Sequence, residues 1–227
     1  MVVGAGGGLG AALLTQLQQG SYARVLGLGR RSEICIDYLD EASIAAAAHS
    51  AAALCTGSGV ALRLLLVATG FLHGEQGRPE RSWTHLNAAY LQQVFAINAL
   101  GPALLIKHFF PLFPTRGPCI AGFVSARVGS ISDNALGGWY GYRASKAALN
   151  QLVKTASIEL SRRNRESICV ALHPGTVDTA LSRPFAKTGL KVRTPHQAAR
   201  DLLAVLSGLT PADSGALVDY QGCKLPF

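Results

Sequence analysis

The sequence predicts a single α/β domain with a doubly wound, seven-stranded parallel sheet. Three observations support this fold class. Short apolar runs alternate with longer helical patterns along the whole chain. The apolar runs are continuous, which is typical of strands covered by helices on both faces of a parallel sheet. No linker or internal repeat divides the 227 residues, so we expect residues 1–227 to form one domain with a sizeable core.

The predicted strands are seven short apolar runs. They are Met1–Val3, Val25–Leu28, Ile34–Ile36, Leu62–Ala68, Cys119–Ser125, Ser167–Leu172 and Ala216–Asp219. Helical patterns fill the intervals between them. The predicted helices are Leu9–Gln19, Asp40–Leu54, Trp83–Phe110, Gly141–Arg163 and Pro195–Ser207. Right-handed crossovers between parallel strands would place these helices on both faces of the sheet.

The composition limits the possible partners. The formal charge is +8, but the basic residues are scattered and no aromatic residues lie between them, which argues against nucleic-acid binding. A cofactor with several phosphates is a simpler partner for this charge. Five cysteines without CxxC spacing indicate reduced thiols in a cytoplasmic protein and no metal site. No signal peptide and no apolar run of membrane-spanning length is apparent, so we expect no membrane partner.

A glycine-rich turn, Gly4–Gly10, follows the first strand directly, with glycines at positions 4, 8 and 10 in the spacing GxxxGxG. Without a Cβ atom the backbone can approach a pyrophosphate, and the following helix directs its N-terminal amides at the phosphates. A flexible glycine stretch or an unrelated tight turn is the alternative. The position between strand and helix favours a Rossmann-type dinucleotide site. We expect Gly4, Gly8, Leu9 and Gly10 to bind the cofactor.

Two arginines indicate which dinucleotide binds. The second predicted strand ends at Leu28 and Gly29, and Arg30 and Arg31 follow. Enzymes that use NAD generally place an acidic side chain there for the ribose hydroxyls. Guanidinium groups instead suit a 2′-phosphate. A solvated basic pair is the alternative, and we predict NADP(H) as the cofactor.

Tyr142 and Lys146 lie four residues apart in a helical segment, so their side chains share one helix face. A nearby ammonium group favours the phenolate and lowers the pKa of a tyrosine from its usual value near 10. The phenol would then serve as a general acid for a carbonyl oxygen. An incidental surface pair is the alternative.

The chain resembles the short-chain dehydrogenase/reductase family over most of its length. Three features stand in the family's order: the glycine turn, the Tyr142 and Lys146 pair, and the later segment Pro174–Thr179. The stretch Gly129–Leu149 resembles the C-factor/sniffer-like carbonyl reductase branch. The resemblance implies hydride transfer between NADP(H) and a small carbonyl or alcohol substrate. It also implies that Tyr142 acts as general acid/base, that Lys146 binds the ribose, and that the chain forms a homodimer or homotetramer. A cofactor-binding signalling or sensor protein with little turnover is the alternative.

The resemblance assigns roles to three further segments. Asn98 would bend the central helix and hold a water for a proton relay, although a plain asparagine inside a helix is the alternative. Gly70 would lie against the cofactor at the end of the fourth predicted strand. The family carries two asparagines before that glycine, where this chain has Val67 and Ala68, so contacts there would come from the backbone. Asp37 would lie near the adenine.

The segment after the sixth predicted strand would lie against the nicotinamide. The resemblance places Pro174 and Gly175 beside the ring, with Val177 and Thr179 at the carboxamide. A generic turn after a strand is the alternative, because Pro-Gly commonly makes one. Residues Leu181–Arg193 stand where the family carries a substrate lid.

The family's usual catalytic serine falls on Ala126 in this chain. Ser125 lies one residue earlier, at the end of the fifth predicted strand. We expect its side chain to point away from the pocket and its backbone to contact the cofactor. Ser130 lies in the following loop, and we predict that it supplies the second hydrogen-bond donor to the substrate carbonyl. The alternative is that Ser130 only caps a turn.

Overall fold

The computed structural model describes residues 1–75, 77–185 and 191–227. These residues form a seven-stranded sheet in the order β2-β1-β3-β4-β5-β8-β9. The strands are β1 (Val2–Val3), β2 (Gly27–Leu28), β3 (Leu64–Val67), β4 (Cys119–Val124), β5 (Ser167–His173), β8 (Leu217–Asp219) and β9 (Lys224–Leu225). All neighbours pair in parallel except β8 and β9, which are antiparallel. The predicted doubly wound α/β fold is confirmed.

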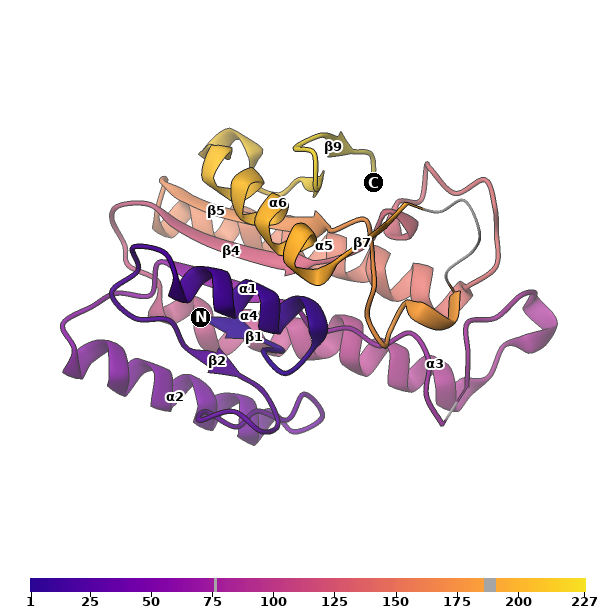
Figure 1. The fold of residues 1–227 in the computed structure, drawn as a ribbon, viewed down its shortest axis with the longest axis horizontal. Coiled ribbons are helices and arrows are strands. Elements are labelled where there is room, and N and C mark those ends of the chain that lie inside the picture. The colour runs from indigo at the N-terminus through magenta and orange to yellow at the C-terminus, as the bar shows by residue number, and fades with distance from the viewer. Residues whose placement is uncertain (76, 186–190) are drawn as a thin grey trace.

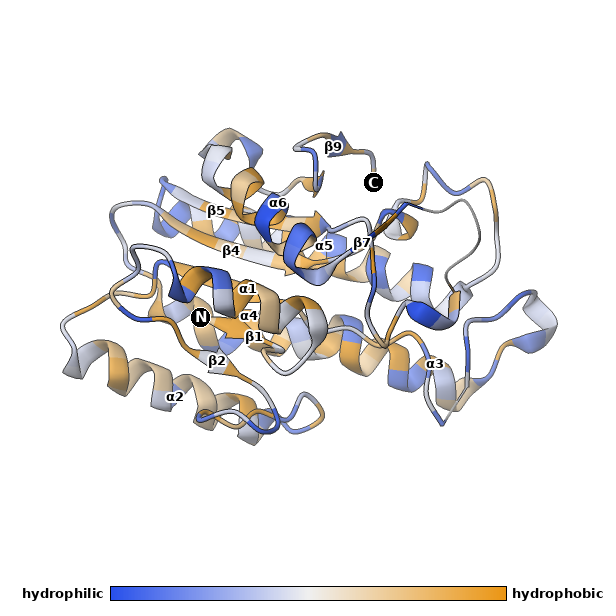
Figure 2. Cartoon of the chain, in the orientation of Figure 1, coloured by the Kyte–Doolittle hydropathy of each residue, from blue (hydrophilic) through white to orange (hydrophobic). Residues whose placement is uncertain are grey.

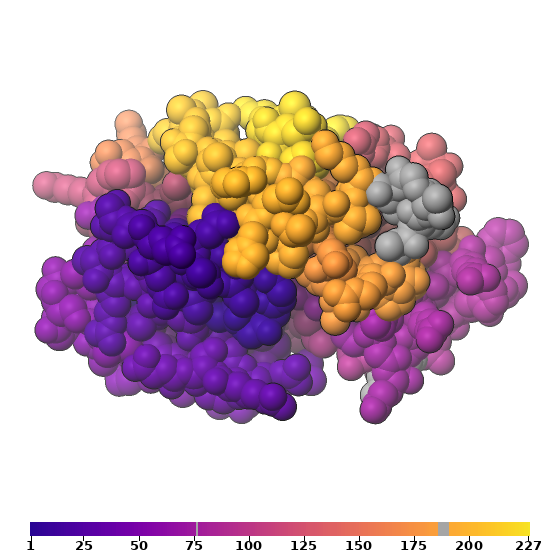
Figure 3. All heavy atoms as spheres, viewed as in Figure 1, coloured from indigo at the N-terminus to yellow at the C-terminus, as the bar shows by residue number. Residues whose placement is uncertain are grey.

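Helices cover both faces of the sheet (Figure 1). One face is covered by α1 (Gly8–Gln18) and α6 (Pro195–Gly208), which lie side by side in the space-filling view (Figure 3). The other face is covered by α2 (Glu41–Gly57), α4 (Gly101–Phe109) and α5 (Tyr140–Arg163). The strands are mainly hydrophobic, whereas the helices mix hydrophobic and hydrophilic residues (Figure 2). Each face of the sheet therefore contributes to a separate hydrophobic cluster.

The predicted strand Ile34–Ile36 does not form. Ile34 makes only an isolated parallel bridge to Leu28, although Ile34 and Ile36 are both buried. The chain has five residues, Gly29–Glu33, between the two bridged positions. Parallel strands need a crossover of about a dozen residues or more, so this link is too short to align a full strand beside β2. The seventh strand is instead β9, which the sequence did not indicate and which follows a tight turn after β8.

The predicted helix Trp83–Phe110 is divided into shorter elements. A 3-10 turn (Trp83–His85) comes first, and α3 (Ala88–Phe95) starts later, after Asn87. The Asn87 side chain accepts a hydrogen bond from Tyr90 N at 2.9 Å and so caps that start. A π-helical turn (Ala96–Leu100) then joins α3 to α4.

The continuous helix from residue 88 to residue 112 has 25 residues and a mean hydropathy of 1.4 in its most apolar window. By length and composition alone it could span a membrane, so the prediction that no apolar run reaches that length is wrong. In this fold the helix contacts α2 and α5 and contributes Leu105 and Phe109 to the core. In this fold 39% of that window is buried, on the side that packs against the domain.

The predicted lid segment Leu181–Arg193 lies only partly within the described residues. A 3-10 turn (Arg183–Phe185) lies near its start, and β7 (Val192–Arg193) ends it. β7 pairs in parallel with β6 (Thr176–Val177) in a separate two-stranded sheet. Residues 186–190 of the predicted lid lie outside the described residues.

Candidate active site

The carboxyl ends of the parallel strands lie along one edge of the sheet. The order β2-β1-β3 means that the chain moves outward from β1 to β2 and then returns to the other side of β1. Such a reversal opens a crevice at the carboxyl edge, where α/β proteins bind ligands. The predicted site residues follow these strand ends. Besides the glycine turn after β1, they include Arg30, Arg31, Gly70, Ser125 and Pro174.

The glycine turn packs so tightly that two of its glycines are required by the fold. Gly4 has a φ of 85°, and a Cβ there would lie 2.8 Å from Thr69 Cγ2. A Cβ on Gly10 would overlap the carbonyl oxygen of Gly4. In contrast, a Cβ on Gly6 would meet nothing within 4 Å. The turn therefore folds closely on itself and leaves open space beside Gly6, in front of the first turn of α1.

That open space suits the phosphates of a dinucleotide. Helix α1 begins at Gly8, and the preceding Gly7 has no side chain that could cap the first amides. Those amides are the groups that bind phosphate at helix N-termini. Thr179 also lies here, because a Cβ on Gly8 would be 3.0 Å from Thr179 Cγ2. The glycine turn and the segment after β5 therefore meet at one place, and the residues present fit the expected cofactor.

The end of β2 lies beside the same turn. A Cβ on Gly29 would be 3.8 Å from Gly6 N. Arg30 and Arg31 are exposed, and neither forms an ion pair with another described residue. Asp37 is exposed as well, and its Oδ1 accepts from Leu39 N at 2.9 Å in the turn before α2. The two guanidinium groups are thus available to a ligand, while the Asp37 carboxylate is held in a local turn.

Four predicted site residues come together at the start of α5. Tyr142 and Lys146 are both buried, and Lys146 Nζ lies 5.8 Å from the centre of the Tyr142 ring. Lys146 Nζ donates to Val124 O at 2.9 Å, at the end of β4. A Cβ on Gly70 would be 3.7 Å from both Lys146 Nζ and Asn98 Oδ1. The geometry therefore joins the ends of β3 and β4 to the helix that carries the tyrosine and lysine.

Asn98 lies in the π-helical turn, and both polar atoms of its side chain have protein partners. Its Oδ1 accepts from Phe71 N at 2.8 Å. Its Nδ2 donates to Phe71 O at 2.8 Å and to Ser145 Oγ at 3.1 Å. The side chain thus ties the loop after β3 to α5, one residue before Lys146.

Burial controls the titration of the central pair. It raises the pKa of Tyr142 to about 12 and lowers the pKa of Lys146 to about 8. The sequence led us to expect a lowered pKa for Tyr142, and in this structure that expectation is wrong. The ammonium group lies beside the ring and donates to Val124 O, so desolvation of the phenol dominates. At neutral pH the phenol therefore keeps its proton, as a general acid requires.

The two serines near Ala126 have different partners. Ser125 Oγ is buried and donates to Asn150 Oδ1 at 2.7 Å, toward α5. Ser130 Oγ is also buried and accepts from Asp133 N at 3.2 Å. The second bond is that of a turn cap, which was the alternative interpretation of Ser130. Ser130 Oγ donates no hydrogen bond to another described residue, so the turn cap does not occupy its hydroxyl proton.

Comparison with known proteins identifies the family. Residues 1–189 match the model of the short chain dehydrogenase family. The chain belongs to this family. This short chain dehydrogenase is 37% identical to C-signal of Myxococcus xanthus over 139 residues, which are 61% of the chain and 80% of C-signal. It is also 37% identical over 138 residues to 1-hydroxy-2-glutathionyl-2-methyl-3-butene dehydrogenase of Rhodococcus sp. (strain AD45), of which the match spans 58%.

Solved structures agree with this assignment. The NADPH-bound carbonyl reductase from chicken fatty liver is 25% identical, with a TM-score of 0.85 over 100% of this chain and 97% of that one. Carbonyl reductase Sniffer of D. melanogaster shares the fold, with a TM-score of 0.83 at 22% identity over 99% of this chain and 97% of Sniffer. The family match and the 37% identity to C-signal confirm the family and the C-factor-like branch predicted from the sequence, and the Sniffer structure confirms the fold.

Sequence reasoning missed Glu80 and Trp139, two residues that hold the start of α5 in place. Glu80 is 2% exposed, and its two carboxylate oxygens accept from Gly141 N at 3.2 and 3.1 Å. Its carbonyl oxygen accepts from Trp139 N at 2.6 Å. Trp139 adopts a left-handed conformation, with a φ of 54°. The Gly-Gly pair before Trp139 was a signal for an unusual turn, but nothing near Glu80 in the sequence indicated a partner 61 residues away.

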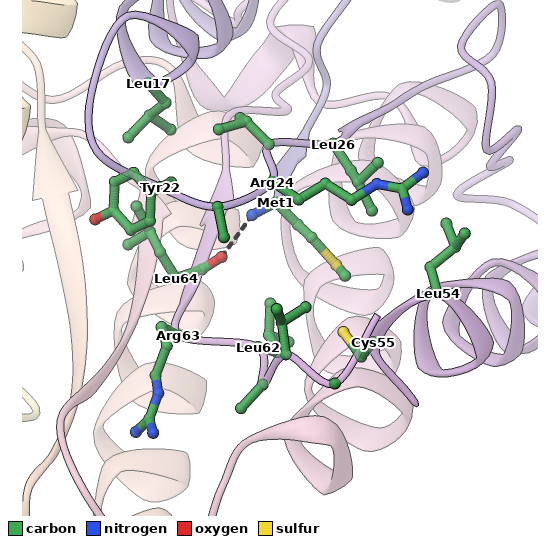
Figure 4. Close-up of a pocket in the computed structure, with 15 residues that line it drawn as sticks. Met1, Leu17, Tyr22, Arg24, Leu26, Leu54, Cys55, Leu62, Arg63 and Leu64 are labelled. Carbon is green, nitrogen blue, oxygen red and sulfur yellow. Dashed lines mark hydrogen bonds between the residues drawn. The ribbon is translucent and has the colours of Figure 1, made fainter. Parts of the chain in front are cut away.

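A cavity of about 390 Å³ lies at the opposite, amino-terminal edge of the sheet (Figure 4). Its lining comes from the residues before β1, β2 and β3, and includes Arg24, Cys55 and Arg63. The Met1 amino group donates to Leu64 O at 2.6 Å within it. None of the predicted site residues lines this cavity, so it is separate from the candidate active site of this short chain dehydrogenase.

Proposed function

We propose that this protein is an NADP(H)-dependent carbonyl reductase that uses Tyr142 as its general acid, and that also catalyses the reverse oxidation of an alcohol. The observation that carries the proposal is the meeting of Gly70, Asn98, Tyr142 and Lys146 beside the glycine turn. A bound cofactor would supply the hydride. The chain's own residues would bind and orient the reactants and move the proton.

The cofactor would lie along the carboxyl edge of the sheet. Its pyrophosphate would bind at Gly4, Gly8, Leu9 and Gly10, where the first amides of α1 point into open space. The exposed guanidinium groups of the basic pair at positions 30 and 31 would bind the 2′-phosphate. The similarity to an NADPH-bound carbonyl reductase at 25% identity supports the same choice.

The remaining cofactor contacts come from segments already at that edge. Gly70 and the backbone of Ser125 would lie near the nicotinamide ribose, which Lys146 would also bind. The segment after β5 would contact the nicotinamide through the residues that resemble the family's. These are Pro174, Gly175, Val177 and Thr179. The contact between Asp37 and the adenine end of the cofactor stays a prediction.

Proton transfer would begin at Tyr142. Its buried phenol is protonated at neutral pH, since burial raises its pKa to about 12. The phenol would donate to the substrate oxygen, and the Lys146 ammonium would stabilise the phenolate that remains. We assign the relay water to the backbone of the π-helical turn near Asn98. Ser130 would supply the second hydrogen bond to the substrate oxygen.

A cofactor-binding signalling protein with little turnover is the second candidate function. It is favoured by the 37% identity to C-signal and by Ala126 at the family's serine position. The buried Tyr142 and Lys146 pair favours the reductase. Cytoplasmic location, a homodimer or homotetramer, and the lack of nucleic-acid and membrane partners stay predictions from the sequence.

Oxidation of NADPH by a panel of ketones and aldehydes tests the proposal. Wild-type protein should oxidise NADPH with at least one carbonyl compound and should bind NADPH more tightly than NADH. Tyr142→Phe should keep cofactor affinity but lose roughly 100-fold in rate, the usual scale for general acid catalysis. Tight NADPH binding with no turnover of any compound would support the signalling protein. Activity of Tyr142→Phe within a few-fold of wild type would contradict the assigned acid.

A further inference from the structure

Three aromatic rings continue outward from Tyr142. The Trp139 ring lies 6.1 Å from the Tyr142 ring between centroids, at an interplanar angle of 76°. The Phe185 ring lies 5.3 Å from Trp139 at 71°, and the His73 ring lies 5.4 Å from Phe185 at 60°. We name His73, Trp139 and Phe185 the aromatic wall. Its members come from the loop after β3, the residue before α5 and the 3-10 turn after β6.

The backbone around the aromatic wall is held in place. Trp139 is the only non-glycine residue with a positive φ among the described residues. Its N–H donates to Glu80 O at 2.6 Å, and its carbonyl oxygen accepts from Arg143 N at 2.8 Å. His73 Nε2 lies 3.1 Å from Ala180 O, which ties the loop after β3 to the segment after β6. An unfavourable conformation fixed from both sides indicates that the position of the Trp139 ring has a function.

The aromatic wall is only partly buried, so its rings can contact a ligand. Within the described residues, two nearby arginines already have partners. Arg143 donates to Gly138 O at 3.0 Å and to Val128 O at 3.4 Å, and Arg183 pairs with Asp178 at 3.0 Å. The partly exposed rings of the aromatic wall therefore present π faces and ring edges next to Tyr142, while these two cations are engaged elsewhere. That environment suits an uncharged ligand.

We propose that the aromatic wall binds the organic group of the substrate and selects planar, uncharged aryl carbonyl compounds. Aromatic groups prefer edge-to-face or offset contacts with other rings. An aryl ring packed against Trp139 and Phe185 in this way would place its attached carbonyl at the Tyr142 hydroxyl. A saturated ring of the same size has no π system and lacks this preference. The proposal rests on the proposed reductase function and adds its substrate class.

Acetophenone and cyclohexyl methyl ketone form a matched pair of probes, since they differ only in the saturation of the ring. The ratio of their kcat/KM values with NADPH should fall about threefold to tenfold in Phe185→Leu relative to wild type, the range expected when one aromatic contact is lost. Comparing ratios between variants removes the intrinsic difference in ketone reactivity. Phe227→Leu is the control, because Phe227 is an exposed ring outside the aromatic wall. An unchanged ratio in Phe185→Leu, or an equal change in the control, overturns the proposal.

A binding measurement separates this proposal from the reductase itself. The chain has two tryptophans, and Trp83 is exposed, so Trp83→Phe leaves Trp139 as the only tryptophan. Its emission should respond to 1-phenylethanol at about threefold to tenfold lower concentration than to 1-cyclohexylethanol, in protein saturated with NADPH, which cannot oxidise either alcohol. Preferential binding without turnover of any ketone would support the aromatic wall and reject the reductase. Equal binding of both alcohols would reject the aromatic wall even in an active reductase.

Discussion

Replacing Glu80 by alanine should weaken the first turn of α5, the helix that carries Tyr142 and Lys146. The buried Glu80 carboxylate accepts from Gly141 N with both oxygens, one residue before Tyr142. The alanine variant would leave that amide without a partner and would create a cavity. The first turn of α5 would then be free to shift, and the phenol would shift with it.

The expected magnitude follows from these contacts. A hydrogen bond to a charged group contributes about 1.5–3 kcal/mol, and a carboxylate at a helix N-terminus adds up to about 2 kcal/mol in a buried setting. The cost of burying the charge offsets part of this gain. We therefore expect Glu80→Ala to lower the free energy of unfolding by about 2 kcal/mol, which lowers the Tm of a domain of this size by about 4–8 °C.

Thermal unfolding of three variants would measure this effect. Glu80→Gln keeps an acceptor oxygen and should lose about half as much stability as Glu80→Ala. Glu159→Ala removes an exposed carboxylate from the same helix and should change the free energy of unfolding by less than about 0.5 kcal/mol. The rate of carbonyl reduction, measured well below every Tm, should also fall in Glu80→Ala. A Tm for Glu80→Ala within about 1 °C of that for Glu159→Ala would refute the reasoning.

Two further predictions concern the glycine turn and the buried lysine. Gly10→Ala should destabilise the fold and abolish cofactor binding, because its Cβ would overlap Gly4 O. Gly6→Ala is the control and should keep the wild-type Tm, because its Cβ would meet nothing within 4 Å. Equal Tm values for the two variants would contradict the packing described here. Burial lowers the pKa of Lys146 from 10.5 to about 8, so its buried charge destabilises the fold most below pH 8 and progressively less as the pH rises toward 10.5. In thermal unfolding, Lys146→Met should therefore raise the Tm at about pH 7 and raise it less at about pH 10. Equal Tm increases at the two pH values would count against a buried ammonium group.

Local spacing in the sequence predicted the parts of the site that depend on neighbouring residues. The glycine turn follows from the tight packing of Gly4 against Thr69 and of Gly10 against Gly4, which only glycine allows. Tyr142 and Lys146 share a helix face at a spacing of four residues. The doubly wound fold followed in the same way from the alternation of apolar runs and helical patterns.

The remaining features depend on contacts that local spacing does not encode. Ile34–Ile36 has the composition of a strand, but the preceding link is too short for a parallel crossover. The lowered pKa expected for Tyr142 assumed that the lysine would dominate, whereas burial does. Glu80 contacts Gly141 across 61 positions, and its sequence neighbours give no sign of that contact.

The two edges of the sheet have a consequence for behaviour at high concentration. An edge strand exposes unpaired amides and carbonyls that can pair with another molecule, and long edges therefore promote aggregation. Here the edge strands β2 and β9 have two residues each. β9 also carries Lys224 and is followed closely by Pro226, two residues that discourage further strand pairing. Neither edge offers a template long enough for another chain to extend the sheet, so the domain is protected against edge-to-edge association.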